Sequence, residues 1–473
     1  MDRTLSLRRF GGQGIIIISL LLVIFLPRIL VGQWYLRQAT LYESQGSFSY
    51  AAVSYEDSAN RLWWMNGLFE KAAQSAFLAG DGSAALGLFR KATGKGDLSS
   101  SGWITFGDLY SQAGDIESAI AAWESVGADT PDSASAFSRL AKANRQKGNF
   151  QKAMEEWGEV VRIEPQNAEA HYNLGLLLMT WQPMDALPEL MLASSLDQEL
   201  DGRVQVLREG LNLAYLQDNP AYHLAVSGQS LASIGEWDLS QEAFLKAIRL
   251  ENNFPEAWAW LGEAYQHTGK DGYPALQTAL TLDQNSVMSL ALTGLYYRRQ
   301  NQIELAWSAY FRAASLDPYN PAWLQALGDL SAQKGDLVNA LDYYQNAVNF
   351  SPQDPISWRA LALFCVQYDV NIANLGMEAA LQGLKLDPEN WQSQDIMGQV
   401  LMAIGDLASA ELYFDKAIKI APDQAEPNLH AGYLLLLKEQ RDEAYDKLVT
   451  AYHLDPDGSV GWQAKRLLDQ YFP

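Results

Sequence analysis

The sequence predicts an all-α protein built from a repeated pair of helices, with one long apolar helix at its start. A pattern of small and aromatic residues returns every 34 residues over most of the 473-residue chain, and an aliphatic run fills residues 14–35. Charge separates the two parts. Residues 1–37 hold five Arg and one Asp, which leaves 29 basic and 55 acidic residues, a net charge of −26, in 38–473.

Composition excludes several classes of function. The formal net charge of −22 is unsuited to a nucleic-acid partner, because a phosphate backbone is bound by clustered Lys and Arg. The single cysteine, Cys365, cannot form an internal disulfide or a cysteine-built metal site. A hydrophobic content of 48% is ample for a core, and a charged content of 19% argues against disorder.

Residues 1–13 predict a short basic cytoplasmic tail, and residues 14–35 predict a transmembrane signal-anchor helix. The run 14–35 has 22 residues. At ~1.5 Å per residue it is long enough to cross a hydrocarbon core of about 30 Å. Arg28 lies near one end, where its side chain can reach the lipid headgroups. Trp34 and Tyr35 lie where aromatic interface anchors are expected.

A cleaved signal peptide is the alternative interpretation of this segment. No A-x-A-like cleavage site follows the apolar run, so we favour an uncleaved anchor. Arg3, Arg8 and Arg9 precede the run, whereas residues 38–57 contain no Lys or Arg. The positive-inside rule therefore predicts a single-pass protein of the cell (inner) membrane, with a cytoplasmic N-terminus and an extracytoplasmic body.

The body repeats with a period of 34 residues. In segments 101–132, 322–354 and 391–424 a Gly is followed by a Gly-Asp pair, then by Ala, an aromatic residue and Pro. Apolar residues at i, i+3 and i+7 place one stripe on a first helix. The Gly-Asp pair ends that helix and caps a second one, which the late Pro ends. The body is therefore predicted to be a row of helix pairs.

This pattern resembles the tetratricopeptide repeat (TPR) family, in which each repeat is two antiparallel helices. One repeat is filled by Trp103, Phe106, Gly107, Tyr110, Gly114, Ala119, Trp123 and Pro131. The resemblance covers about nine-tenths of the chain. It implies a right-handed α-solenoid of about twelve TPR helix hairpins with a C-terminal capping helix. The expected repeats start at residues 32, 66, 100, 134, 168, 221, 255, 287, 321, 355, 391 and 425.

Two TPR blocks are expected along this array. The N-terminal block covers 32–198, and its first helix is expected to continue from the membrane helix. Residues 199–220 predict an irregular extra helix, after which the C-terminal block covers 221–458. Residues 459–473 predict a capping helix with one solvated face.

The sequence contains no catalytic constellation. Its five His residues fall in separate repeats without metal-ligand spacing, and neither a P-loop nor a GxSxG motif is present. Cys365 lies among apolar residues and is expected to fill the core. We therefore expect no enzyme activity, no cofactor and no metal.

The inner face of the array is the predicted partner site. The resemblance implies that the first helices line the concave face. Its positions are held here by Lys142, Arg145, Glu169, Tyr172, Glu263, His267, Arg298, Arg299, Asp329, Arg359 and Asp395, with Asn173 beside Tyr172. From these we select Lys142, Arg145, Tyr172, Asn173, Arg298, Arg299 and Arg359 as the partner site. Because basic residues are sparse in this acidic body, we expect them to receive an acidic or C-terminal carboxylate. The alternative is an ordinary solvated surface.

The pair Trp63 and Trp64 has no packing role in the repeat pattern. Because the pair ends the first repeat close to the predicted membrane helix, we assign it, with Arg28, Trp34 and Tyr35, to the membrane interface, with a contact to a partner as the alternative. The 15 Trp of the chain also suggest sugar stacking, but repeat positions account for many of them.

Together these observations predict a non-enzymatic, membrane-tethered scaffold for protein–protein interaction or for assembly of a cell-envelope complex. The expected partners are protein subunits of membrane or envelope complexes. Two alternatives are a chaperone or regulator that captures peptides, and an accessory subunit of an envelope enzyme system such as polysaccharide assembly.

Overall fold

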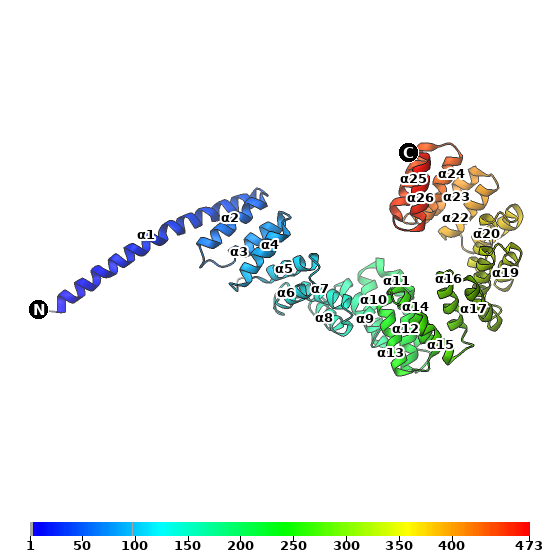
Figure 1. Cartoon of the computed structure of the whole chain (residues 1–473), viewed down its shortest axis with the longest axis horizontal. Helices are drawn as coiled ribbons and strands as arrows, with labels where there is room; N and C mark the ends of the chain where they lie inside the picture. Colours follow the sequence, from blue (N-terminus) through cyan, green and yellow to red (C-terminus); the bar gives the residue numbers. More distant parts are fainter. Residues whose placement is uncertain (1–2, 97) are drawn as a thin grey trace. The chain divides into compact units, whose positions relative to one another are not determined.

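The computed structural model describes residues 3–96 and 98–473, with side chains from residue 23 onward except those of residues 24 and 97. Over these residues the chain forms 26 α-helices, two short helical turns and no strand (Figure 1). The predicted all-α repeat architecture is confirmed. Twenty-four helices form twelve consecutive hairpins, while α11 (Asp201–Ala214) and α26 (Ser459–Tyr471) are additional.

Each hairpin has a first and a second helix, joined by a short turn. The first helices are α1 (Arg3–Ser44), α3 (Leu68–Leu78), α5 (Ser100–Gln112), α7 (Ser133–Gln146), α9 (Ala168–Leu178), α12 (Pro220–Ser233), α14 (Pro255–His267), α16 (Val287–Arg299), α18 (Pro321–Gln333), α20 (Pro355–Gln367), α22 (Trp391–Ala403) and α24 (Ala425–Leu437). The second helices are α2 (Phe48–Arg61), α4 (Gly82–Thr93), α6 (Ile116–Glu124), α8 (Phe150–Ile163), α10 (Pro183–Leu196), α13 (Trp237–Leu250), α15 (Tyr273–Leu282), α17 (Ile303–Leu316), α19 (Leu337–Phe350), α21 (Met377–Leu386), α23 (Leu407–Ile420) and α25 (Arg441–Leu454).

The Gly-Asp pair forms the turn within the hairpin, as the sequence predicts. Gly405 has φ +88° between α22 and α23, a left-handed conformation that costs glycine little. Asp406 then caps α23, since its side chain accepts a hydrogen bond from the Ser409 amide at 3.1 Å. In the last hairpin the corresponding left-handed residue is Glu439, with φ +64°.

The two helices of a hairpin approach closely because a small residue of the first helix faces a large side chain of the second. A Cβ placed on Gly398 would lie 2.6 Å from the Phe414 ring. A Cβ on Gly328 would lie 2.9 Å from the ring of Tyr344. Phe414 is fully buried, with Ala410 and Ala417 on the same face of α23.

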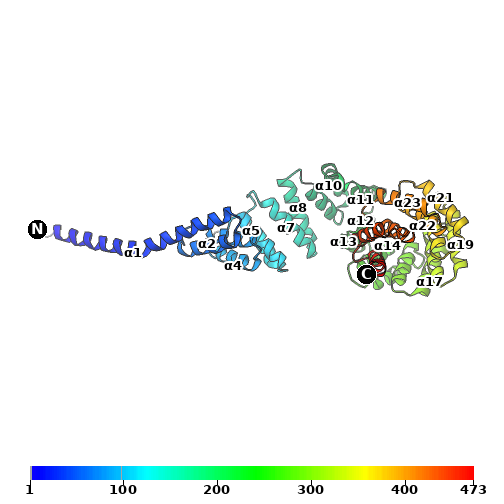
Figure 2. The same cartoon turned by 90° about the horizontal axis from the view of Figure 1, so that it is seen from above.

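The C-terminal part of α1 is the first helix of the first hairpin. Leu62 packs against Gly32, and the Ser58 hydroxyl donates to the Gly32 carbonyl at 3.1 Å. Both views show α2 lying along this end of α1 (Figures 1 and 2). The continuous helix that the sequence predicts across residue 32 is therefore present.

The predicted membrane helix, 14–35, falls partly outside the residues whose side chains the structure describes. The structure does not describe the side chains of residues 14–22 and 24, nor those of Arg3, Arg8 and Arg9 in the basic tail. Over the part of the chain whose side chains are described, no helix combines the length and apolar character needed to cross a membrane.

The chain divides into two compact units, residues 1–246 and 247–473, and the division falls within the sequence of α13. In the first unit, α11 packs between α10 and α12. Gly210 of α11 lies against α12, where a Cβ would clash with the Ser230 hydroxyl. Helix α11 lies within residues 199–220, where the sequence predicts an extra helix.

The turn geometry yields a matched pair of stability predictions. Gly405→Ala is expected to lower the free energy of unfolding by about 1 kcal/mol, because alanine strains the left-handed backbone although space is available there. Glu439→Gly is expected to raise it by up to about 1 kcal/mol for the same reason. Urea unfolding followed by circular dichroism measures both. Equal shifts of the midpoint in the same direction would contradict this explanation.

Candidate functional site

A groove of about 380 Å³ crosses three consecutive first helices, α20, α22 and α24, in the unit 247–473. Its lining is formed by Ile356, Arg359, Ala360, Leu363, Trp391, Gln392, Asp395, Ile396, Gln399, Glu426 and His430. These side chains occur at matching places of successive repeats, on the faces that the resemblance assigns to the inner surface. The groove therefore contains one predicted site residue, Arg359.

The floor of the groove holds a buried carboxylate with two partners. Asp395 is 3% exposed. It accepts a hydrogen bond from Gln399 Nε2 at 2.8 Å, and its two oxygens lie 2.9 and 3.0 Å from His430 Nδ1. Burial lowers the pKa of His430, but the charge and hydrogen bond of Asp395 outweigh burial and raise it above its usual value. Asp395 and His430 thus form an ion pair when the imidazole is protonated.

Arg359 lies beside this pair and is also buried. Its Nη1 is 3.2 Å from Asp387 Oδ2 and donates to Ser393 Oγ at 3.1 Å. Its stem packs against Gly383, where an added Cβ would lie 3.3 Å from Arg359 Cγ. The guanidinium therefore joins α20 to α21 and α22 instead of pointing into solvent as a free charge.

Apolar side chains border this polar floor. Ile356 is 56% exposed and Leu363 is 40% exposed, and the Trp391 side chain is half-buried. Exposed apolar residues around a few fixed polar groups are typical of a surface that binds another polypeptide. The rim can bury partner side chains, while the floor offers fixed donors and acceptors that set their orientation.

Three of the predicted inner-face residues of the first unit, Lys142, Arg145 and Asn173, make polar contacts within the chain. Lys142 is ion-paired with Glu169 at 2.7 Å, and Asn173 donates to the Glu169 carbonyl at 2.8 Å. Arg145 donates two hydrogen bonds to Asp238, at 2.9 and 3.0 Å, and also pairs with Glu236. Tyr172 is buried, and burial raises the pKa of its hydroxyl.

Arg298 and Arg299 differ in their surroundings although they are adjacent. Arg299 makes two hydrogen bonds of 2.7 Å to Glu263, which is 4% exposed. Arg298 pairs with Asp329 at 3.2 Å, and both of those side chains are about half exposed. All five basic residues of the predicted site are therefore ion-paired within the chain. A carboxylate of a partner would have to compete with those pairs.

The five residues assigned to the membrane interface gather at one end of the first hairpin. Arg28 donates to the Asn60 carbonyl at 2.8 Å, and the Arg61 guanidinium lies 4.6 Å from the centre of the Tyr35 ring. Arg28 is exposed, and so are the three tryptophans of the group, Trp34 (55%), Trp63 (61%) and Trp64 (44%). Trp63 and Trp64 pack edge to face at 5.9 Å.

Sequence reasoning missed the His430–Asp395–Gln399 network, because it treats each His as an isolated structural residue. The available signal was spacing. Side chains roughly one repeat apart meet across neighbouring first helices, as Asp395 does with His430 and Arg359 with Ser393. Among the described residues, no group of three or more His, Cys, Asp or Glu side chains is arranged to hold a metal ion.

Comparison with known proteins supports the repeat assignment. Models of the tetratricopeptide repeat match residues 141–180, 291–355 and 392–424. These three segments therefore match the tetratricopeptide repeat, in agreement with the 34-residue period of the sequence. One similar solved structure is the APC/C hetero-tetramer Cut9–Hcn1, with 14% identity, a TM-score of 0.41 and coverage of 93% of this chain and 96% of that chain.

Two curated proteins are similar over part of their length. A DnaJ homolog subfamily C member 7 homolog of Schizosaccharomyces pombe is 29% identical over 139 residues, which are 26% of this chain and 29% of that protein. The mitochondrial import receptor subunit TOM70 of Homo sapiens is 29% identical over 193 residues, or 38% of this chain and 32% of that protein. The chain thus spans about three-tenths of the length of these relatives.

The two neighbouring arginines provide a matched test of their pairing. Arg299→Gln is expected to lower the free energy of unfolding by about 3 kcal/mol, because it removes the guanidinium from the buried Glu263 carboxylate and leaves it with only Gln266 and His267 beside it. Arg298→Gln removes an exposed pair and is expected to cost less than about 1 kcal/mol. Urea unfolding of the full chain measures both. Equal losses would show that the buried pair has no special role.

Proposed function

We propose that this chain is a non-enzymatic scaffold, tethered to the cell membrane, that binds protein partners and assembles them into an envelope complex. The observation that carries the proposal is the groove over α20, α22 and α24, where an apolar rim surrounds a fixed polar floor. A repeat array holds such a surface rigidly, because each hairpin is packed against its neighbours. One similar protein is named an import receptor subunit, which agrees with a binding role for the repeats.

The proposed tether is the segment 14–35, with its cytoplasmic tail at 1–13. The supporting observations are the apolar run in the sequence and the tryptophans that gather at the end of the first hairpin. Indole rings favour the boundary between lipid and water, because they combine an apolar body with a hydrogen-bond donor. The array is then held on the extracytoplasmic side, where envelope proteins are its available partners.

Photo-crosslinking tests the groove directly. A benzophenone amino acid in place of the exposed Gln392, which lines the groove, is expected to crosslink a partner in native membranes. The matched control is Val338 on α19, which is 74% exposed and lies outside the groove. Adding Leu363→Glu should abolish the crosslink, because it places a charge on the apolar rim. Equal crosslinking from both positions, or none from Gln392, would overturn the groove proposal.

Cysteine labelling in intact cells tests the topology. A membrane-impermeant maleimide is expected to label a cysteine placed at the exposed Ser135 but not one placed at Ser6. Cys365 gives no background, since it is fully buried and burial raises its pKa to about 11. Labelling at Ser6 without labelling at Ser135 would place the array in the cytoplasm and contradict the proposed tethering.

A further inference from the structure

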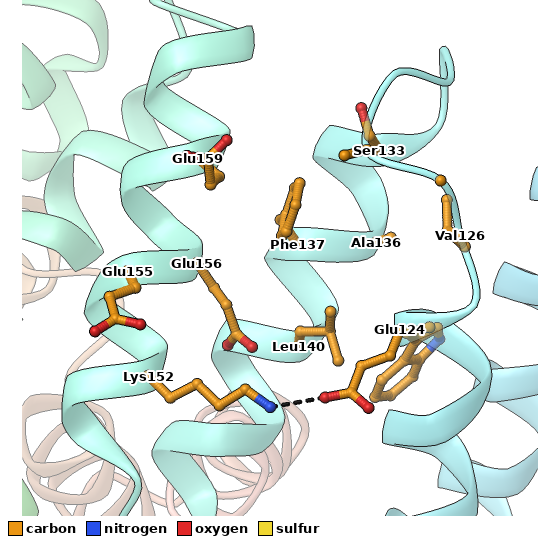
Figure 3. Close-up of a pocket in the computed structure, with 13 residues that line it drawn as sticks. Glu124, Val126, Ser133, Ala136, Phe137, Leu140, Lys152, Glu155, Glu156 and Glu159 are labelled. Carbon is orange, nitrogen blue, oxygen red and sulfur yellow. Dashed lines mark hydrogen bonds and ion pairs between the residues drawn. The ribbon is translucent and has the colours of Figure 1, made fainter.

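A cavity of about 690 Å³ lies between α6, α7 and α8, in the unit 1–246 and away from the groove in the C-terminal repeats. Figure 3 shows Phe137 and Leu140 of α7 between the Glu side chains of α8 and the opposite wall, formed by Glu124 and Val126. The volume is within the range of about 300–1,000 Å³ that is usual for ligand sites.

The cavity lies where the second helix of a hairpin, α6, is short. Helix α6 has nine residues, whereas α8 and α10 have fourteen each. Residues 125–132 instead form turns that lead to Ser133, the first residue of α7. Helix α6 therefore ends before it would cover the neighbouring side chains of α7.

The floor of the cavity is apolar. Trp123, Ala136 and Leu140 are each at most 4% exposed as residues, and the partly buried Phe137 lies with them. The indole N–H of Trp123 is already engaged, since it lies 3.3 Å from the Ile104 carbonyl and 3.2 Å from Asp108 Oδ1. This surface therefore contacts apolar groups and offers them no competing hydrogen bonds.

The walls are acidic. Four carboxylates line the cavity, those of Glu124, Glu155, Glu156 and Glu159, against one ammonium group, that of Lys152. Lys152 pairs with Glu124 at 2.7 Å (Figure 3). Arg162, which does not line the cavity, pairs with Glu159 at 2.7 Å but is 62% exposed. Both pairs leave the lining with an excess of negative charge.

Glu156 is the buried member of this group. It is 6% exposed and accepts hydrogen bonds of 2.9 and 3.0 Å from Asn144 Nδ2. Burial raises the pKa of Glu156 to about 7, although the Asn144 hydrogen bonds and the charge of Lys152 act in the opposite direction, and Glu124 and Glu155 add to the rise. A cation in the cavity would stabilise the ionised form, so its binding is expected to release a proton near neutral pH.

We propose that this cavity is a second docking site, which receives a partner segment that carries an arginine or lysine beside a bulky apolar residue. The cation lies among the carboxylates of α8, and the apolar side chain covers Phe137 and Leu140. A polypeptide fits better than a free polyamine, because a polyamine has no bulky group for the floor. The net charge of −26 over residues 38–473 attracts such segments from a distance.

The probe is a short acetylated peptide of alternating Arg and Leu with a fluorescein label. Its binding to the full chain in detergent is measured by fluorescence anisotropy at about 0.15 M salt, where long-range attraction is largely screened. Three comparison peptides are used. In the first Arg is replaced by Glu, and in the second Leu is replaced by Gly. The third alternates Ser and Gly and therefore has neither a cationic nor a bulky apolar side chain. Unlabelled spermine serves as the competing small polycation.

Glu155→Lys with Glu159→Lys is expected to weaken binding of the Arg-Leu peptide at least about tenfold. The matched control, Glu199→Lys with Glu209→Lys, changes the net charge equally at two exposed positions outside the cavity and is expected to bind like the unmodified chain. Peptide binding should also slow amide exchange in residues 124–140. Glu156→Gln should remove the gain in affinity between about pH 6 and about pH 8 that proton release produces.

Three results would overturn the proposal. The first is that binding is not specific to the cavity: either the Arg-Leu peptide shows no measurable binding, or both double variants weaken its binding equally. Equal weakening would indicate attraction to the whole acidic surface. The second is equal binding of the Arg-Gly peptide together with displacement by spermine, which would indicate a polycation site. The third is protection from exchange confined to residues 356–430, which would place the peptide in the other groove.

Discussion

The structure depends on a close contact, found in most of the hairpins, between a glycine of the first helix and a large side chain of the second. At Gly107 the fit is so close that an added Cβ would lie 2.3 Å from the indole of Trp123. Such contacts hold the two helices of a hairpin together on one side and leave apolar faces on the other. A single hairpin cannot bury those faces, so each must stack on the next one.

Stacking determines which polar side chains meet. Residues at matching places of neighbouring repeats come together, as Arg299 does with Glu263 and Asp395 with His430. Residues 38–473 include 29 basic and 55 acidic residues, and the basic residues predicted on the inner face form ion pairs within the chain. The surfaces left for partners are therefore apolar or acidic. Such surfaces differ from the cationic groove that the sequence predicts. Their composition explains why both candidate sites combine apolar side chains with carboxylates.

Much of the fold follows from the sequence, because spacing alone determines it. The expected repeat start at residue 391 coincides with Trp391 of α22, and the start at 221 lies one residue after Pro220 of α12. The partners of Arg299 and Arg145 could not be predicted, since they depend on how neighbouring hairpins stack. The cavity was also missed. It lies where α6 ends early, at Glu124, in a segment whose Gly127 and Pro131 match ordinary repeat turns.

The central claim is that the inner groove of α20, α22 and α24 binds a protein partner. Hydrogen–deuterium exchange of the full chain, purified alone and within its detergent-extracted native complex, tests this claim most directly. The account predicts slower exchange in the complex over residues 356–363, 391–399 and 426–430, with little change along α19, α21 and α23. Protection of those second helices, with unchanged exchange in the groove, would contradict it.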